Sequence, residues 1–203
     1  MSYPIPKKST EIEIEIKNSR FIGYAEPTSS IAQAQAVIAA RKALHPKANH
    51  NCWAFLAGAP NTYENRGCSD DGEPKGTAGQ PMLKVLDHSG IGHLCVVVTR
   101  YFGGIKLGTG GLVRAYSQCT SQTIEALTLV QFIPQASLRL SFPYPLTGQA
   151  ELLITQVAGT VTTREWSEKA IFSVEMPTHK VNEFKASLEP WPQISLLNGA
   201  HQT

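Results

Sequence analysis

The order of the segments that follow Pro134 constrains the fold of this chain more than any other feature of its sequence. Stretches that alternate apolar and polar residues, which is typical of strands, are separated there by stretches with helical spacing. The strand–helix–strand–strand–helix–strand order is that of a ferredoxin-like domain. The expected strands are 136–142, 160–166, 170–176 and 193–197, and the expected helices are 147–157 and 178–188.

The part of the chain before Pro134 has a different pattern. Glu11–Lys17 alternates acidic residues with isoleucine, and a short turn separates it from the apolar stretch Phe21–Glu26, so we expect a hairpin. Ser29 or Ser30 can cap the Ala- and Gln-rich helix that follows. This helix ends near Leu44, because Pro46 disfavours a helical residue before it.

The middle of the chain combines two irregular segments with a strongly apolar strand. Asn61–Gly79 has no periodicity and is rich in Gly, Asp, Asn and Pro, which predicts a long loop, and such loops are usually functional or mobile. A short helix is expected at Pro81–His88. Leu94–Arg100 predicts a central strand, because both of its faces are apolar. The glycine-rich Gly103–Gly111 then leads into a helix expected at Leu112–Leu127.

The length of the chain agrees with two domains. Its 203 residues are long for one average domain, and each half contains enough apolar residues to bury a core. We therefore expect an α+β protein with an N-terminal domain at 1–133 and a ferredoxin-like C-terminal domain at 134–203.

Charge and cysteine content narrow the class of protein without identifying a partner. The formal net charge of +2 is too small to indicate nucleic-acid binding by itself. The most apolar run, Leu94–Val98, is far shorter than the roughly 20 residues that cross a bilayer. The four cysteines form no Cys-x-x-Cys pair, and no apolar signal segment follows the N-terminal lysines. We expect a soluble, cytoplasmic protein with reduced thiols and no membrane partner.

The run of glycines between the apolar strand and the next helix is the first candidate binding site. We expect positive φ angles at Gly110 and Gly111, which only glycine adopts easily. The helix start presents unpaired N–H groups that bind anions when cationic side chains assist. The alternative is that the glycines only permit tight packing of strand and helix. The candidate phosphate-binding residues are Arg100, Gly103, Gly104, Lys106, Gly108, Thr109, Gly110, Gly111 and Arg114.

The acidic segment SDDGEPKGT is the second candidate site. Its three carboxylates lie within four residues and would hold Mg²⁺ if a phosphate ligand completed the coordination shell. The structural alternative, which we favour, is that the aspartates accept backbone N–H bonds and that the segment around Gly72 forms a turn. The candidate residues of this loop are Ser69, Asp70, Asp71, Glu73 and Thr77.

The motifs of common enzyme classes do not fit this sequence. The segment from Gly103 to Thr109 lacks the lysine of a Walker A loop, and neither a Rossmann fingerprint nor a Gly-x-Ser-x-Gly elbow is present. Cys52 lies two residues after His50 and on the same side of an expected strand, but a buried structural cysteine is the commoner outcome. The sequence therefore specifies no catalytic residue, no metal ligand set and no cofactor.

These segments together resemble the IMPACT family, whose bacterial members are called YigZ-type proteins. The resemblance covers nearly the whole chain. It implies a first domain similar to the second domain of ribosomal protein S-five and a ferredoxin-like second domain, together similar to domains four and five of elongation factor G. The motifs that carry the resemblance are Ser19-Arg20-Phe21-Ile22, His50-Asn51-Cys52, SDDGEP with Gly76-Thr77-Ala78-Gly79, and Arg100-Tyr101-Phe102-Gly103-Gly104 with Leu107 to Gly111.

The resemblance also implies a role in translation, because the eukaryotic relatives are regulators that compete for the activator of an amino-acid-starvation kinase. We expect a binding protein that contacts RNA, the ribosome or a translation-related protein through the two motif loops. One alternative is an enzyme or binding protein for a phosphorylated small molecule or nucleotide, in which the glycine-rich loop holds the phosphate and the acidic loop a metal. The other alternative is a purely protein-binding regulator.

Overall fold

The computed structural model describes residues 2–197, and the chain divides into two compact units. One unit comprises Tyr3–Phe132, and the other begins at Ile133. Both units combine helices with antiparallel sheets, so the predicted α+β class is confirmed. Each unit buries apolar side chains of its own, and we describe the two separately.

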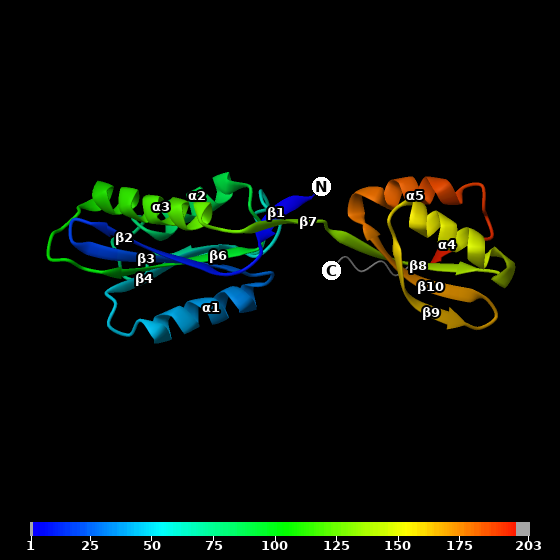
Figure 1. Cartoon of the computed structure of the whole chain (residues 1–203), viewed down its shortest axis with the longest axis horizontal. Helices are drawn as coiled ribbons and strands as arrows, with labels where there is room; N and C mark the ends of the chain where they lie inside the picture. The colour runs from blue at the N-terminus through cyan, green and yellow to red at the C-terminus, as the bar shows by residue number, and fades with distance from the viewer. Residues whose placement is uncertain (1, 198–203) are drawn as a thin grey trace. The chain divides into compact units, whose positions relative to one another are not determined.

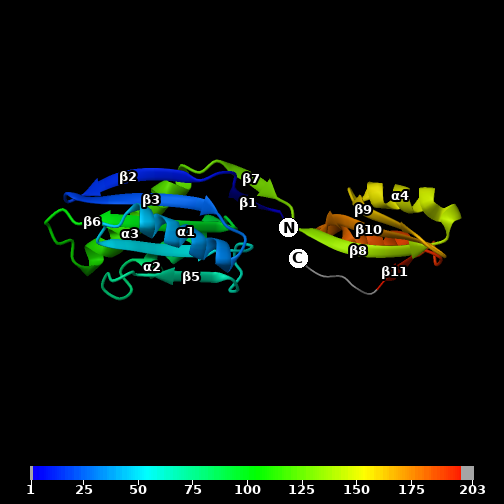
Figure 2. The same cartoon turned by 90° about the horizontal axis from the view of Figure 1, so that it is seen from below.

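The first unit is built on a five-stranded sheet in which all neighbouring strands are antiparallel. β6 is the middle strand, and β2 and β5 form the two edges (Figure 2). In the order of the sheet, the strands are β2 (Thr10–Ile16), β3 (Ser19–Pro27), β6 (Leu94–Tyr101), β4 (His50–Leu56) and β5 (Arg66–Ser69).

β6 lies between two apolar cores, one on each face of the sheet. Val96 and Val98 contribute to the core on one face, while Cys95 and Val97 contribute to the core on the other face. Successive side chains of a strand point to opposite faces, so an entirely apolar strand needs cover on both faces. The prediction of a central strand at this position is confirmed.

Helices cover both faces of this sheet (Figure 1). α1 (Ile31–Leu44) lies on one face, and α2 (Gly79–Ser89) and α3 (Thr109–Glu125) lie on the other. α1 begins where predicted, because the Ser30 hydroxyl accepts a hydrogen bond from the Gln33 N–H and so caps the helix.

The hairpin predicted near the N-terminus is present as β2 and β3. Lys17 and Asn18 form its turn with φ angles of 49° and 62°. Two consecutive residues with positive φ are typical of the turn that matches the twist of a tight hairpin.

Three strands were not expected from the sequence. β5 lies inside the segment that was predicted to be a loop, where it pairs with β4. β1 (Tyr3–Pro6) and β7 (Leu129–Phe132) pair with each other as a separate two-stranded sheet. All three strands have four residues, so their own alternation of side chains is too short to recognise.

The second unit has the predicted β-α-β-β-α-β order of a ferredoxin-like domain. Its sheet has the strand order β11-β8-β10-β9 and is antiparallel throughout. α4 and α5 cover one face of this sheet (Figure 1). The elements are β8 (Gln135–Phe142), a 3₁₀ turn (Tyr144–Leu146), α4 (Thr147–Gln156), β9 (Thr160–Trp166), β10 (Ala170–Pro177), a 3₁₀ turn (Thr178–Lys180), α5 (Val181–Leu188) and β11 (Ser195–Leu197).

The strand expected over 193–197 is shorter in the structure, where β11 begins at Ser195 and extends to Leu197. Among residues 2–197, no helix is both long enough and apolar enough to cross a membrane.

The four cysteines are unpaired, and three of them, Cys52, Cys95 and Cys119, are buried.

Candidate functional site

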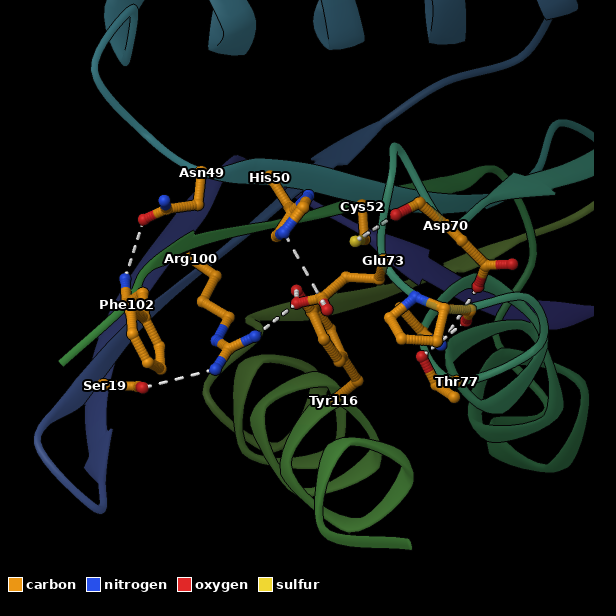
Figure 3. Close-up of polar contacts among 12 residues, drawn as sticks. Ser19, Asn49, His50, Cys52, Asp70, Glu73, Thr77, Arg100, Phe102 and Tyr116 are labelled. Carbon is orange, nitrogen blue, oxygen red and sulfur yellow. Dashed lines mark hydrogen bonds and ion pairs between the residues drawn. The ribbon is translucent and has the colours of Figure 1, made fainter. Parts of the chain in front are cut away.

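The motif loops of the first unit meet at one end of the five-stranded sheet, where hydrogen bonds hold them together (Figure 3). The Phe102 N–H donates to the Asn49 side-chain oxygen at 2.8 Å, and the Gly103 N–H donates to the Ser19 hydroxyl at 3.2 Å. Gly103 packs directly on the turn between β2 and β3, because a Cβ atom there would collide with the Asn18 carbonyl. The loop after β6 is therefore fixed on two sides.

A buried ion pair lies beneath these loops. Arg100 Nη1 donates to Glu73 Oε1 at 2.7 Å, and the Tyr116 hydroxyl donates to the same oxygen at 2.8 Å. Arg100 Nη2 also donates to the Ser19 hydroxyl at 3.4 Å (Figure 3). The side chains of Arg100 and Glu73 are only 7% and 3% exposed. The pair thus joins the end of β6, the acidic loop and α3, and much of the Arg100 charge is balanced inside the protein.

Asp70 organises the acidic loop and the start of α2. Its carboxylate accepts backbone N–H bonds from Gly76, Ala78 and Gly79 at 2.8, 3.0 and 2.8 Å. Burial raises the pKa of Asp70, but these hydrogen bonds outweigh that effect and hold its pKa below the usual value. Asp70 therefore acts as a charged cap for backbone groups at the entrance of the helix.

The remaining predicted residues of the acidic loop also face the protein. Asp71 accepts a hydrogen bond from the Asn51 N–H at 2.7 Å and pairs with Lys42 at 2.6 Å. The Ser69 hydroxyl accepts from the Asp71 N–H at 3.1 Å. The Thr77 hydroxyl donates to the Pro74 carbonyl at 2.6 Å. These bonds tie the loop to β4 and to itself.

The arrangement of the carboxylates does not resemble a metal site. Asp70 faces backbone N–H groups, Asp71 faces Lys42, and Glu73 faces Arg100 and Tyr116. Within residues 2–197, no three His, Cys, Asp or Glu side chains are placed to hold a metal ion together. The contacts are those of the structural alternative, in which the acidic side chains shape the loop.

His50 and Cys52 do not form a thiolate pair. The Cys52 thiol donates to the Asp70 carbonyl at 2.9 Å, and burial raises the pKa of this thiol well above its usual range. His50 Nδ1 lies 2.9 Å from the Asp71 carbonyl, which requires a proton on Nδ1. Its Nε2 atom lies 3.8 Å from Glu73 Oε2. Cys52 is therefore a structural residue at this position.

The glycine-rich loop differs in detail from the prediction. α3 begins at Thr109, before the expected start at Leu112, so Gly110 and Gly111 lie in its first turn. The expected positive φ at these two glycines is wrong, because the positive values belong to Gly104 (87°) and Gly108 (73°). The sharp change of direction occurs before the helix, where Gly108 serves as the N-cap without a side-chain hydrogen bond.

A groove with a volume of about 440 Å³ opens beside the loops. Phe102, Leu107 and Leu112 give it apolar walls, and Phe102 as a residue is 45% exposed. Of the predicted phosphate-binding residues, the groove brings together Arg100, Lys106, Gly108 and Thr109. The exposed Arg114 lies on α3 and does not line it.

Sequence reasoning did not assign roles to Tyr116 and Asn49 at this site. Tyr116 lies on α3, and the spacing that buries its ring against the sheet is readable in the sequence as one face of a helix. Asn49 carries no comparable signal, because its role depends on the position of Phe102 in a distant segment.

Fold and site together define a two-unit α+β protein whose first unit carries a loop-lined groove over a buried Arg–Glu pair. The Impact N-terminal domain matches residues 17–124, which include the whole groove. The chain is 40% identical to the IMPACT family member YigZ of Escherichia coli (strain K12) over 195 residues, or 96% of each chain. It is 37% identical to the IMPACT family member YvyE of Bacillus subtilis (strain 168) over 183 residues, or 90% of this chain and 83% of the relative.

A solved crystal structure of a protein described only as hypothetical is also similar. It has 39% sequence identity and a TM-score of 0.72, and the match covers 97% of this chain and 96% of the other. The chain therefore belongs to the IMPACT family, as the resemblance of its motifs predicted.

Proposed function

We propose that this protein acts in translation by binding RNA, and that the loop-bearing end of its first unit is the contact surface. The family to which the chain belongs is generally associated with translation regulation. The observation that carries the proposal is the distribution of charge at this end. The side chains of Asp70, Asp71 and Glu73 are held in hydrogen bonds and ion pairs within the chain, whereas several cationic side chains face outwards.

The acidic loop contributes little outward negative charge. Asp70 is bonded to backbone N–H groups, Asp71 to Lys42, and Glu73 to Arg100. Five exposed cations of this region form no ion pair within residues 2–197: Lys17, Lys47, Lys75, Lys106 and Arg114. Clustered cations of this kind attract the phosphate backbone of a nucleic acid, even when the net charge of the protein is small.

Phosphate contacts position a nucleic acid without reading its sequence. We therefore expect Lys106→Ala and Arg114→Ala each to weaken binding of a single-stranded RNA without changing its sequence preference. Each substitution should reduce the slope of log K against log salt by up to about one unit. Lys84→Ala, which removes an exposed lysine from α2, is the matched control and should leave the slope unchanged.

Fluorescence anisotropy at several salt concentrations measures these affinities. If the parent protein shows no salt-dependent RNA binding, RNA is rejected as the partner. A protein component of the translation apparatus then becomes the leading proposal, and copurification from RNase-treated lysate tests it.

A second candidate function is the binding of a phosphorylated small molecule. The groove volume of about 440 Å³ favours it, because ligand pockets typically have volumes of about 300–1,000 Å³. The contacts of the carboxylates argue against the metal-dependent version of this function. Calorimetric titration with a sugar phosphate, with and without Mg²⁺, tests it, and Mg²⁺-dependent binding would support a metal role.

A further inference from the structure

The start of α3 lies on one side of the groove and has no side-chain cap. Its first N–H groups have no partners within the helix, and the N-cap residue Gly108 provides no side-chain hydrogen bond. Lys106 lines the groove just before this point and is exposed. A helix start of this kind, with a cation beside it, favours a phosphate group.

Arg100 provides a second, independent indication of a ligand. This residue is only 6% exposed and lines the same groove. Two of its nitrogens bond to Glu73 and Ser19, but its buried Nε has no acceptor among the described side chains and backbone. Buried donors are almost always satisfied, so this N–H marks a place beside the groove where the described part of the chain supplies no acceptor.

Phe102 provides a surface for a flat ring. The residue is about half exposed, and the Arg100 guanidinium lies 5.5 Å from the centre of its ring. The hydrogen bond from its backbone N–H to Asn49 fixes the position of this residue (Figure 3). Leu107 and Pro74 continue the apolar lining, and nucleobases stack on such rings whatever their identity.

We propose that the groove binds one nucleotide, with its base on Phe102 and its phosphate at the start of α3 beside Lys106. The Glu73 carboxylate also lines the groove, but Arg100 balances it, and the phosphate lies toward the helix. This inference rests on the proposed contact surface for RNA. The nucleotide is either free or the terminal nucleotide of an RNA strand, and both present the same base and phosphate.

The test is a titration of the full chain with AMP, adenosine and a short single-stranded RNA, the last with either a 5′-phosphate or a 5′-hydroxyl. AMP should bind about tenfold more tightly than adenosine, because charge-assisted hydrogen bonds hold its phosphate. Phe102→Leu should weaken AMP binding about fivefold or more through the loss of stacking. Lys106→Ala should weaken AMP binding but not adenosine binding.

Tyr144→Leu is the matched control, because Tyr144 is also 45% exposed but belongs to the second unit. It should not change AMP affinity. Arg100→Ala is not a useful variant, because it leaves buried Glu73 without its cation. Circular dichroism confirms that each variant is folded before its affinity is compared.

The outcomes separate this inference from the proposed function. If the 5′-phosphorylated RNA binds more tightly than AMP and than the 5′-hydroxyl RNA, the ligand is an RNA end. If AMP binds and RNA does not, the nucleotide site stands and the RNA function fails. A third outcome is that RNA binds with salt dependence, that AMP does not bind, and that Phe102→Leu leaves RNA affinity unchanged. In that case the nucleotide site is overturned and the RNA function stands. Absence of all binding overturns both.

Discussion

At the scale of single residues, Glu73 and Arg100 show how two motifs that look functional also support the fold. Each lies in a separate charged motif, and the structure joins them in one buried pair with Tyr116. Burial makes such a pair costly to break, because the remaining charge keeps its desolvation penalty without its partner.

Glu73→Gln should therefore lower the free energy of unfolding by about 3 kcal/mol or more, since it leaves the Arg100 charge buried and unbalanced. Glu13→Gln is the matched control, because Glu13 pairs with Arg20 at the surface, where both side chains are about half exposed. Such surface pairs contribute about 0–1 kcal/mol. Urea denaturation measures both variants, and equal losses would contradict a special role for the buried pair.

The hydrogen bonds of Asp70 make the free energy of unfolding depend on pH. Its pKa is lower in the folded protein than in the unfolded chain, so the folded state favours the carboxylate. Its contribution to stability is complete above the unfolded pKa of about 3.9 and is lost as the pH falls through the lower folded pKa.

Asp70→Asn should lower the free energy of unfolding at pH 7 by about 1–2 kcal/mol, because it weakens charge-assisted bonds to three backbone N–H groups. The difference from the parent should shrink below about pH 4. Urea denaturation at pH 7, 5, 4 and 3 checks this. Glu168→Gln, at an exposed residue, is the control, and a difference that stays constant with pH would exclude the role assigned to Asp70.

At the scale of elements, the start of α3 shows that neighbouring glycines have different roles. Gly108 has a φ angle of 73°, a conformation that side chains with a Cβ atom rarely adopt. Gly110 lies within the helix, and a Cβ atom there would meet nothing within 4 Å. Replacing glycine by alanine should therefore have opposite effects on stability at Gly108 and Gly110.

Gly108→Ala should destabilise the protein by about 1–2 kcal/mol through backbone strain. Gly110→Ala should be neutral or stabilising by up to about 1 kcal/mol, because alanine favours helix more than glycine does. Thermal and urea unfolding of the two variants measure the effects. If Gly110→Ala were the more damaging variant, the observed start of α3 would be wrong.

At the scale of the whole molecule, each unit has a complete sheet, its own helices and its own core. β7 pairs with β1 inside the first unit, so the chain leaves that unit only after Phe132. This arrangement agrees with two domains that fold without each other.

We therefore predict that fragments 1–132 and 133–203, expressed separately, each unfold in a single cooperative transition. A first fragment that ends at residue 127 should be less stable, because it lacks the partner of β1. Circular dichroism melts and hydrogen exchange measure the stability of each of these fragments. A fragment that remains unfolded alone would show that its unit depends on the other.

The sequence by itself determined the elements whose own pattern is long enough to recognise. The β2–β3 hairpin, the buried β6, the capped α1 and the six main elements of the second unit follow from local periodicity, capping and turn residues. The family also followed from local motifs, because such motifs are contiguous in the chain.

Only the tertiary structure decided the short strands and the geometry of the groove. β1 and β7 are far apart in the sequence and become strands only by pairing with each other. In the same way, nothing near Arg100 in the sequence shows that Glu73 balances its charge, while Lys106 remains exposed beside the groove. Periodicity is a local property that a sequence displays directly, whereas pairing, burial and charge balance depend on residues that meet only after folding.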